Sequence, residues 1–176
     1  MRVAMIQMDM QLGKPEANFE KAEKLVRVAA ELKPDVITLP ETWNTGFFPR
    51  ENLKEASDVD LEQTKKLFSR LAKEYRVNII AGSVANCRDE KIYNTAAVFN
   101  RDGEVVMEYD KVHLFSPSGE HEYFEHGKNI CNFELDGIPC SLVICYDIRF
   151  PELIRSEMLA GSKVQFVVAQ WPDTRL

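Results

Sequence analysis

Residues 139–152 read Pro-Cys-Ser-Leu-Val-Ile-Cys-Tyr-Asp-Ile-Arg-Phe-Pro-Glu. The apolar run at 141–144 contains two β-branched residues and predicts a short buried strand. Pro151 is suited to the first turn of a helix, where the N–H that it lacks would be unpaired anyway. Apolar residues then recur at helical spacing until Gly161, a natural stop. Cys145 therefore lies where a strand ends and a helix is about to begin.

Two interpretations of Cys145 are open at this point. Ligands of open α/β sheets bind at the carboxyl edge of the strands, where backbone N–H groups can stabilise a thiolate or an oxyanion. A free cysteine also behaves as a small hydrophobe, and the residue type by itself favours a buried, inert side chain. The surroundings of Cys145 and two other segments have to decide between these interpretations.

The first half of the chain predicts alternating strands and helices. Apolar strands are expected at 3–8, 36–39 and 77–84. Amphipathic helices are expected between them, and the second, over 58–75, can be capped by Asp58 or Asp60. Gly82 interrupts the third strand. A strand, a helix and a strand at this spacing form a βαβ unit, so the first two strands are predicted to pair in parallel.

The second half of the chain predicts two antiparallel hairpins. The turn at 100–103 joins apolar runs at 92–99 and 104–109, and Asp136-Gly137 precedes the strand that leads to Cys145. Both turns contain glycine, which supplies the positive φ that a tight turn requires. A helix over 151–160 and a buried strand at 164–169 follow. Antiparallel strands after a βαβ unit predict a mixed sheet.

Composition bounds the class of protein. The chain has 176 residues, of which 45% are hydrophobic and 28% charged, and its net charge is −6. These values are typical of one globular domain, and we expect no nucleic-acid partner because no basic face is evident. The N-terminus is apolar too briefly for a signal peptide, and no stretch is long enough to span a bilayer. We therefore expect a cytoplasmic protein with no membrane partner.

The four cysteines, at 87, 131, 140 and 145, form no Cys-x-x-Cys pair. Structural disulfides are not expected in a reducing compartment. A metal site built from Cys131, Cys140, His121 and His126 can be drawn, but its spacing matches no standard zinc arrangement. The sequence therefore predicts no metal and no cofactor.

Glu41 comes directly after the strand at 36–39 and Pro40, at a carboxyl edge of the predicted sheet. The loop that follows contains Trp43, Phe47 and Phe48. These rings are interpreted either as the wall of a pocket or as a hydrophobic lid over the core. A carboxylate at a strand end is usually solvated, so Glu41 alone does not predict catalysis.

Lys111 supplies a cation between the first hairpin and a long polar and aromatic loop at 116–127. Loops of this length in a compact domain are commonly functional, although a solvated excursion is the alternative. Acyl transfer by a cysteine requires a nucleophile, a base and a cation or donors for the oxyanion. Cys145, Glu41 and Lys111 offer these groups, but His113 is a rival base and leaves a Cys–His hydrolase open.

Three segments resemble the signatures of the nitrilase superfamily of carbon–nitrogen hydrolases. They are Leu39-Pro40-Glu41, residues 110–115 (Asp-Lys-Val-His-Leu-Phe) and residues 144–152 (Ile-Cys-Tyr-Asp-Ile-Arg-Phe-Pro-Glu). The resemblance implies an α/β protein with the αββα sandwich fold and mixed sheets. It also implies a Glu-Lys-Cys triad in a hydrolase of non-peptide carbon–nitrogen bonds, which needs no metal or cofactor.

The resemblance implies a role for each residue of the site. Cys145 would be the nucleophile, Glu41 the general base, and Lys111 the group that stabilises the tetrahedral intermediate together with the backbone N–H of Tyr146. A second glutamate in the loop after the lysine often assists in this family. Glu120 matches that position better than Glu122, the alternative.

The Tyr-Asp pair after the cysteine resembles the amidase branches, and the Gly-Glu-His loop and the Gln170-Trp171-Pro172 edge resemble ω-amidases. This implies a small linear amide, such as an ω-amide of a dicarboxylic acid, as substrate. Tyr146, Arg149 and Trp171 are the predicted substrate contacts. An ion pair of Arg149 with Asp147 or Glu152 is the alternative. A carbamoyl-amine hydrolase of the same fold also stays open, and the resemblance implies a homo-oligomer.

Members of this family continue beyond the Trp-Pro edge, whereas this sequence ends at Leu176. The expectation is therefore that residues 1–176 form one carbon–nitrogen hydrolase domain that is incomplete on its C-terminal side. A non-catalytic remnant or a binding subunit is the alternative. Strands that are apolar on both faces need a covering layer on both sides. Uncovered strand edges and apolar surface are therefore expected to make this chain associate with other chains.

Overall fold

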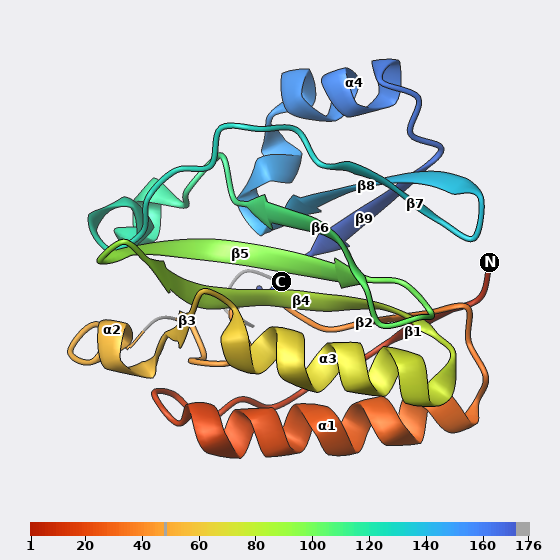
Figure 1. The fold of residues 1–176 in the computed structure, drawn as a ribbon. Helices are drawn as coiled ribbons and strands as arrows, with labels where there is room; N and C mark the ends of the chain where they lie inside the picture. The colour runs from red at the N-terminus through yellow and green to blue at the C-terminus, as the bar shows by residue number, and fades with distance from the viewer. Residues whose placement is uncertain (48, 172–176) are drawn as a thin grey trace.

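The structure is a computed structural model that describes residues 1–47 and 49–171. Two β-sheets lie face to face between layers of helix (Figure 1). The larger sheet consists of β1 (Val3–Met5), β2 (Val36–Thr38), β3 (Asp58–Val59), β4 (Asn78–Arg88), β5 (Lys91–Phe99) and β6 (Val105–Asp110). Its strand order is β1-β2-β4-β5-β6, with β3 paired to β4. The smaller sheet, in the order β7-β8-β9, consists of β7 (Asn132–Leu135), β8 (Ile138–Ile144) and β9 (Val164–Val168).

The helices form the two outer layers. The α-helices are α1 (Pro15–Glu31), α2 (Leu53–Ala56), α3 (Glu62–Tyr75) and α4 (Pro151–Leu159). The long helices α1 and α3 lie side by side against the larger sheet, and α4 lies on the outer side of the smaller one (Figure 1). The predicted αββα sandwich with mixed sheets is confirmed.

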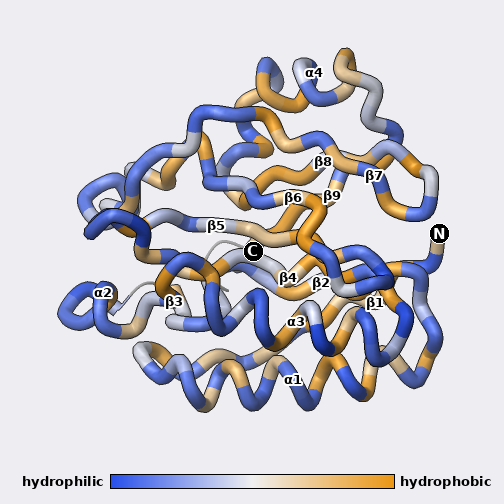
Figure 2. Tube along the Cα trace, in the orientation of Figure 1, coloured by the Kyte–Doolittle hydropathy of each residue, from blue (hydrophilic) through white to orange (hydrophobic). Residues whose placement is uncertain are grey.

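Two apolar clusters hold the layers together. One packs α1 and α3 on the larger sheet around Val26, Phe68 and Ile79. The other fills the space between the sheets, with Val36 and Ile80 facing Leu142. Hydrophobic residues follow the strands, whereas α1 and α3 alternate between hydrophobic and hydrophilic residues (Figure 2). This pattern is expected when each sheet buries one face on the other and each helix buries one stripe.

Strand directions bring several element ends to one edge of the larger sheet. β2 pairs in parallel with both β1 and β4, as the βαβ pattern predicted. β5 is antiparallel to β4 and to β6, so β6 runs in the same direction as β2. Residues that directly follow β2 and β6 therefore meet at the same edge. The hairpins β5–β6 and β7–β8 are both confirmed.

The predicted helix over 58–75 was wrong at its start. Asp60 and Leu61 have φ values of 51° and 58°, so the backbone is left-handed there and the helix begins only at Glu62. Asp58 lies in β3 instead, and its carboxylate accepts hydrogen bonds from the backbone N–H groups of Gln63 and Thr64 at 3.0 and 2.8 Å. Asp58 thus satisfies first-turn donors from outside the helix.

The predicted extent of the first strand, 3–8, was wrong, and the strand predicted to be buried at 164–169 is partly exposed. β1 ends at Met5 rather than at residue 8, and the Met5 side chain is 81% exposed. Val167 in β9 is 41% exposed. In the described part of the chain β1 pairs only with β2, and β9 only with β8, so each forms the edge of its sheet.

Candidate active site

A bulge in β4 holds Glu41 at the end of β2. The pairing of β4 with β5 shifts register between Ile80 and Ser83, where Gly82 has a φ of 64°. A Cβ on Gly82 would lie 2.1 Å from the carbonyl oxygen of Pro40, so this approach requires glycine. Ser83 donates its backbone N–H to that carbonyl at 3.1 Å. Glu41 is thereby fixed with its side chain fully buried.

Lys111 follows β6 and reaches the Glu41 carboxylate. Its backbone N–H bonds the carbonyl of Asn94 on β5 at 2.9 Å. Its Nζ lies 2.8 Å from Oε1 of Glu41 and 2.9 Å from Oε2 of Glu120, and all three side chains are buried. Burial favours a lower pKa for Lys111, but the charges of the two carboxylates outweigh it and raise the pKa. The ammonium group therefore stays charged.

Glu120 is brought into this group by a short 3₁₀ turn at Glu120–Glu122. Its Oε2 accepts the backbone N–H of Phe115 at 2.5 Å, and its Oε1 accepts the side-chain amide of Asn94 at 3.0 Å. Asn94 also donates to Oε1 of Glu41 at 3.1 Å, so one amide links the two acids. Glu122 is exposed, and the structure brings only Glu120 of these two glutamates to Lys111.

Cys145 lies where β8 gives way to a 3₁₀ turn, Cys145–Arg149, as the sequence predicted. Its φ of 47° is left-handed, which is uncommon for a residue with a side chain and often marks a functional position. Burial and then the charge of Glu41 raise the pKa of Cys145 to about 12, while Lys111 acts in the opposite direction. The side chain is half-buried, whereas Cys87, Cys131 and Cys140 are buried.

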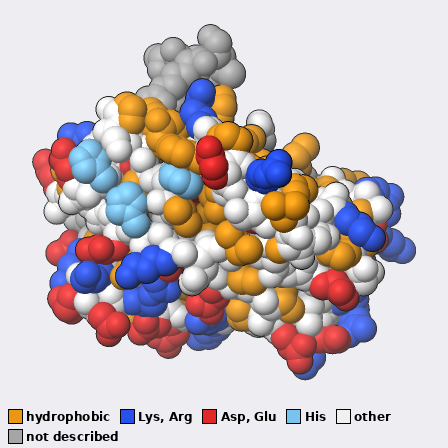
Figure 3. Space-filling model, turned by 90° about the horizontal axis from the view of Figure 1, so that it is seen from above, with side chains coloured by type: hydrophobic (Ala, Val, Ile, Leu, Met, Phe, Trp, Pro, Cys, Tyr) orange, Lys and Arg blue, Asp and Glu red, His pale blue; other side chains and the backbone are white. Residues whose placement is uncertain are grey.

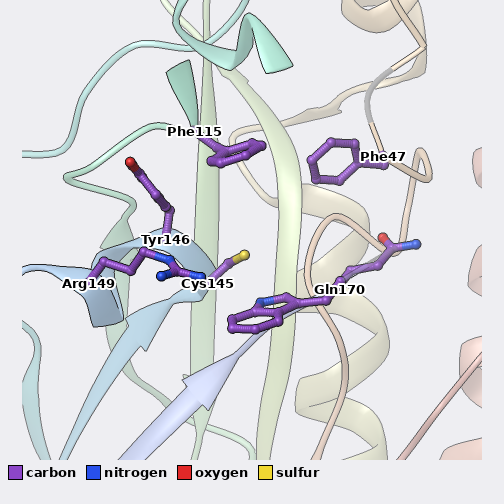
Figure 4. Close-up of a pocket in the computed structure, with 7 residues that line it drawn as sticks. Phe47, Phe115, Cys145, Tyr146, Arg149 and Gln170 are labelled. Atoms are coloured by element: carbon purple, nitrogen blue, oxygen red, sulfur yellow. The ribbon is translucent and has the colours of Figure 1, made fainter. Parts of the chain in front are cut away.

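A small pocket of about 90 Å³ opens beside this sulfur. Its lining comes from four segments that are distant in sequence: Phe47, Phe115, Cys145, Tyr146, Arg149, Gln170 and Trp171. The Cys145 side chain points into the space that these residues surround (Figure 4). The backbone N–H of Gln170, just after β9, donates to Oε2 of Glu41 at 3.2 Å. The pocket and the buried charged group are therefore parts of one site.

A family model described as carbon-nitrogen hydrolase matches residues 2–175. The chain belongs to the carbon-nitrogen hydrolase family. This agrees with the three segments around Glu41, Lys111 and Cys145 that carried the resemblance.

Curated relatives of this carbon-nitrogen hydrolase include amidases. A 2-oxoglutaramate amidase of Bacillus subtilis (strain 168) is 40% identical over 174 residues, which cover 99% of this chain and 66% of the relative. A protein of Staphylococcus aureus named hydrolase in agr operon is 40% identical over 178 residues, covering 100% of this chain and 68% of that protein. A human omega-amidase is 33% identical over 159 residues, or 86% of this chain and 57% of the enzyme. The chain thus spans about two thirds of the first two relatives.

Solved structures show the same fold. A CN-hydrolase superfamily protein of Xanthomonas campestris has a TM-score of 0.84 at 26% identity, over 99% of this chain and 66% of that one. A branch 10 member of the nitrilase superfamily from Saccharomyces cerevisiae has a TM-score of 0.88 at 23% identity, also over 99% and 66%. The larger sheet, the smaller sheet and their helices are thus those of other carbon-nitrogen hydrolases.

His113, the rival base, is engaged away from the pocket of the carbon-nitrogen hydrolase. Its ring Nδ1 lies 2.9 Å from Oδ1 of Asp147, and its ring stacks on that of Phe150 with centroids 3.7 Å apart. It is not one of the residues that line the pocket beside Cys145. This geometry gives the imidazole a partner other than the thiol.

The predicted substrate contacts all line the pocket. Arg149 is exposed, and its guanidinium lies 5.7 Å from the ring centroid of Trp171. Within residues 1–47 and 49–171 it forms no ion pair, so the alternative pairing with Asp147 or Glu152 was wrong. The carboxylate of Asp147 is occupied by other donors.

The aromatic loop after Glu41 contributes one ring to the core and another to the wall of the pocket. Trp43 is fully buried, donates its indole N–H to the carbonyl of Ala81 at 2.7 Å and packs edge-on against Phe68, so it belongs to the core. Phe47 lines the pocket. Phe48 and Pro172, which were part of the predicted loop and edge, lie outside the described residues.

Asn94, Phe115 and Asp147 contribute to the site but were not predicted as site residues from the sequence. Asn94 lies in a hairpin strand and carries no local signal, while Phe115 acts on Glu120 through its backbone. The pairing of β5 with β6 could have suggested Asn94, because it places this residue opposite the segment that follows β6. Only the packed structure shows that the amide reaches two acids.

In residues 1–47 and 49–171, no group of three or more His, Cys, Asp or Glu side chains is arranged to hold a metal ion. None of the helices in this part of the chain has the length and apolar character needed to cross a bilayer. All four cysteines are unpaired.

Proposed function

We propose that this chain carries the catalytic site of an amidase that uses Cys145 as its nucleophile. The observation that carries the proposal is the position of the Cys145 thiol, at a left-handed backbone turn beside the buried group of Glu41, Lys111 and Glu120. A nucleophile, a carboxylate and a cation are the three groups that thiol-dependent acyl transfer requires.

In the first half of the reaction, Glu41 removes the proton from the Cys145 thiol as sulfur attacks the amide carbonyl carbon. The carbonyl oxygen becomes an oxyanion, stabilised by Lys111 and by the backbone N–H of Tyr146. When the intermediate collapses, the carbon–nitrogen bond breaks and Glu41 gives its proton to the leaving nitrogen. The products are ammonia and a thioester on Cys145.

In the second half, Glu41 removes a proton from water, which attacks the thioester carbonyl through the same oxyanion. The carbon–sulfur bond breaks, and the Glu41 proton returns to the sulfur as the carboxylic acid leaves. Within residues 1–47 and 49–171, Oε2 of Glu41 accepts one hydrogen bond, from the Gln170 N–H, so it retains accepting capacity for this proton.

Thiol deprotonation by a base, rather than a preformed thiolate, follows from the raised pKa of Cys145. Burial of the thiol and then the charge of Glu41 raise this pKa to about 12, although Lys111 acts in the opposite direction. Cys145 is therefore protonated at neutral pH, and attack requires a base that acts in the transition state. Glu41 is the carboxylate that acts on this thiol.

Glu120 would serve to hold Lys111 in place. Both of its oxygens are already engaged, by Lys111, by the Asn94 amide and by the Phe115 N–H. An ammonium group has three N–H donors. Those of Lys111 face three carboxylate oxygens, Oε1 of Glu41 at 2.8 Å and the two oxygens of Glu120 at 3.1 and 2.9 Å, so one N–H group would turn from Glu120 to the developing oxyanion.

For the substrate we propose a small amide that also carries a carboxylate. Arg149 supports this, because it lines the pocket with its guanidinium unpaired by any described acid. Two of the relatives are named 2-oxoglutaramate amidase and omega-amidase. The purified chain should be offered a dicarboxylic acid monoamide, its methyl ester and a carbamoyl amine. Equal kcat/KM for the monoamide and the ester would remove the carboxylate requirement, and preference for the carbamoyl amine would favour the alternative hydrolase.

We also propose that residues 1–176 are an incomplete domain, active in the cytoplasm as part of a homo-oligomer. The edges of β1 and β9 border an open groove of about 750 Å³ that reaches Gln170 and Trp171, next to the proposed site. On the face that carries α4, hydrophobic side chains are interspersed with charged ones (Figure 3), and Leu159 of this helix is 76% exposed. Four unpaired thiols are typical of a reducing compartment.

A further inference from the structure

Asp147 lies two residues after Cys145 and takes no part in the proposed chemistry, yet it is fully buried and both carboxylate oxygens are used twice. Oδ1 accepts the backbone N–H of His113 at 2.7 Å and lies 2.9 Å from the ring Nδ1 of the same residue. Oδ2 accepts the Tyr109 hydroxyl at 2.8 Å and the backbone N–H of Ile144 at 3.1 Å. Such a complete set of donors offsets the cost of burying the charge.

The donors come from both sides of Lys111 and from the residue before Cys145. Tyr109 precedes Lys111 by two residues and His113 follows it by two. Tyr109 is buried; its burial and the charge of Asp147 raise the pKa of its hydroxyl, which therefore remains a donor. The stacking of His113 on Phe150 adds a second contact between the same two segments.

We propose that Asp147 is a positioning residue that fixes Lys111 relative to Cys145. This inference rests on the proposed function, since it concerns the geometry of that site. Lys111 follows a strand of the larger sheet and Cys145 follows a strand of the smaller one, so the two belong to layers joined by apolar packing. Directional hydrogen bonds that one carboxylate accepts from both segments set the distance between cation and thiol.

The test is Asp147→Asn, an isosteric change in which the new NH₂ group faces two donors and must break contacts on one side. The matched control is Glu157→Gln. Glu157 is a fully buried acid of α4 that accepts the backbone N–H of Cys131 at 3.1 Å, away from Lys111. Steady-state kinetics on the monoamide are combined with the rate at which iodoacetamide alkylates Cys145, read by mass spectrometry.

For Asp147→Asn we expect kcat to fall about 100-fold, the scale of a displacement of about 1 Å in a catalytic group, while KM changes less than about threefold. Alkylation should slow about tenfold, toward the rate of Lys111→Met, because the displaced ammonium group no longer stabilises the thiolate. Glu157→Gln should stay within about twofold of the wild type in all three quantities.

The direction of the alkylation change separates positioning from mere stability. Loss of structure would expose Cys145 and speed its alkylation, which would overturn the inference. The inference would also be overturned if Asp147→Asn and Glu157→Gln changed kcat and the alkylation rate equally, or if Asp147→Asn kept the wild-type values. If the wild type hydrolyses no amide, the proposed function fails, and the alkylation rates still decide the role of Asp147.

A second pair of variants tests the connection through His113. His113→Asn keeps a side-chain donor near the position of ring Nδ1, whereas His113→Leu removes it. We expect a higher kcat in His113→Asn than in His113→Leu, with the same KM in both variants. Equal kcat in the two variants would show that the ring contact with Asp147 does not position Lys111.

Discussion

Replacing Glu41 by glutamine is expected to change two properties of Cys145 in opposite directions. Glutamine keeps an oxygen that can accept from Lys111 and Asn94, but it cannot take a proton from the thiol. The carboxylate charge also contributes to the raised pKa of the thiol, second to burial. Removing that charge lowers the pKa of Cys145 and increases the thiolate population, whereas removing the base slows amide turnover.

The size of the turnover effect follows from the pKa of about 12 against an ordinary value of 9.0. At neutral pH the thiolate of Cys145 is about a thousandfold rarer than that of an ordinary cysteine. Each factor of ten in this population corresponds to a free-energy difference of about 1.4 kcal/mol. A mechanism without the base would have to work from this small population. We therefore expect kcat to fall about 100- to 1000-fold in Glu41→Gln, the usual scale for losing a positioned base.

Two measurements on the same protein preparation test this reasoning. Single-turnover thioester formation on the monoamide reports acylation, and alkylation of Cys145 by iodoacetamide reports the thiolate. The rate of thioester formation should fall steeply, while the rate of Cys145 alkylation should rise at least about threefold. Glu122→Gln, which alters an exposed glutamate on the Glu120 turn, is the matched control and should change neither. Loss of both acylation and alkylation would refute the reasoning, as would a larger loss of turnover in His113→Asn than in Glu41→Gln.

Four further predictions concern the thiol of Cys145, its pH dependence, the substrate and the sheet edges. Cys145→Ala should abolish turnover and the acyl adduct seen by mass spectrometry, whereas Cys87→Ala and Cys140→Ala should keep most activity; an adduct on either of those would contradict the assignment. The raised pKa favours the neutral thiol of Cys145 in the folded state, so the contribution of this thiol to stability is complete below pH 9.0 and is lost as pH rises toward about 12. For the same reason, the rate at which wild-type Cys145 is alkylated should keep rising with pH and show no plateau near neutrality. Arg149→Gln should raise KM for the monoamide about tenfold and leave that for its methyl ester nearly unchanged. The isolated 1–176 chain should self-associate in size-exclusion chromatography through the exposed edges of β1 and β9; a sharp monomer peak with a cooperative melt would argue against this.

Much of the fold follows from local patterns. The hairpin turns at 100–103 and 136–137, the βαβ unit and the helix that begins at Pro151 were predicted because periodicity and turn residues act over a few positions. The start of α3 was not, because its first predicted residues pair with β4 instead and two left-handed residues separate that strand from the helix. Strand pairing with a distant partner overrides local helical preference there.

By itself, the sequence determined that Cys145 ends a strand, that Glu41 and Lys111 follow others, and that the chain belongs to the carbon–nitrogen hydrolases, because these features are written in short contiguous segments. Only the tertiary structure decided that Glu120 rather than Glu122 meets Lys111, that Trp43 is core while Phe47 lines the pocket, and that Asp147 spans both segments. Neighbouring residues of one loop carry similar local signals. Which of them is buried against a distant group depends on how the two sheets pack, and the hydrogen bonds across that packing have no counterpart in sequence spacing.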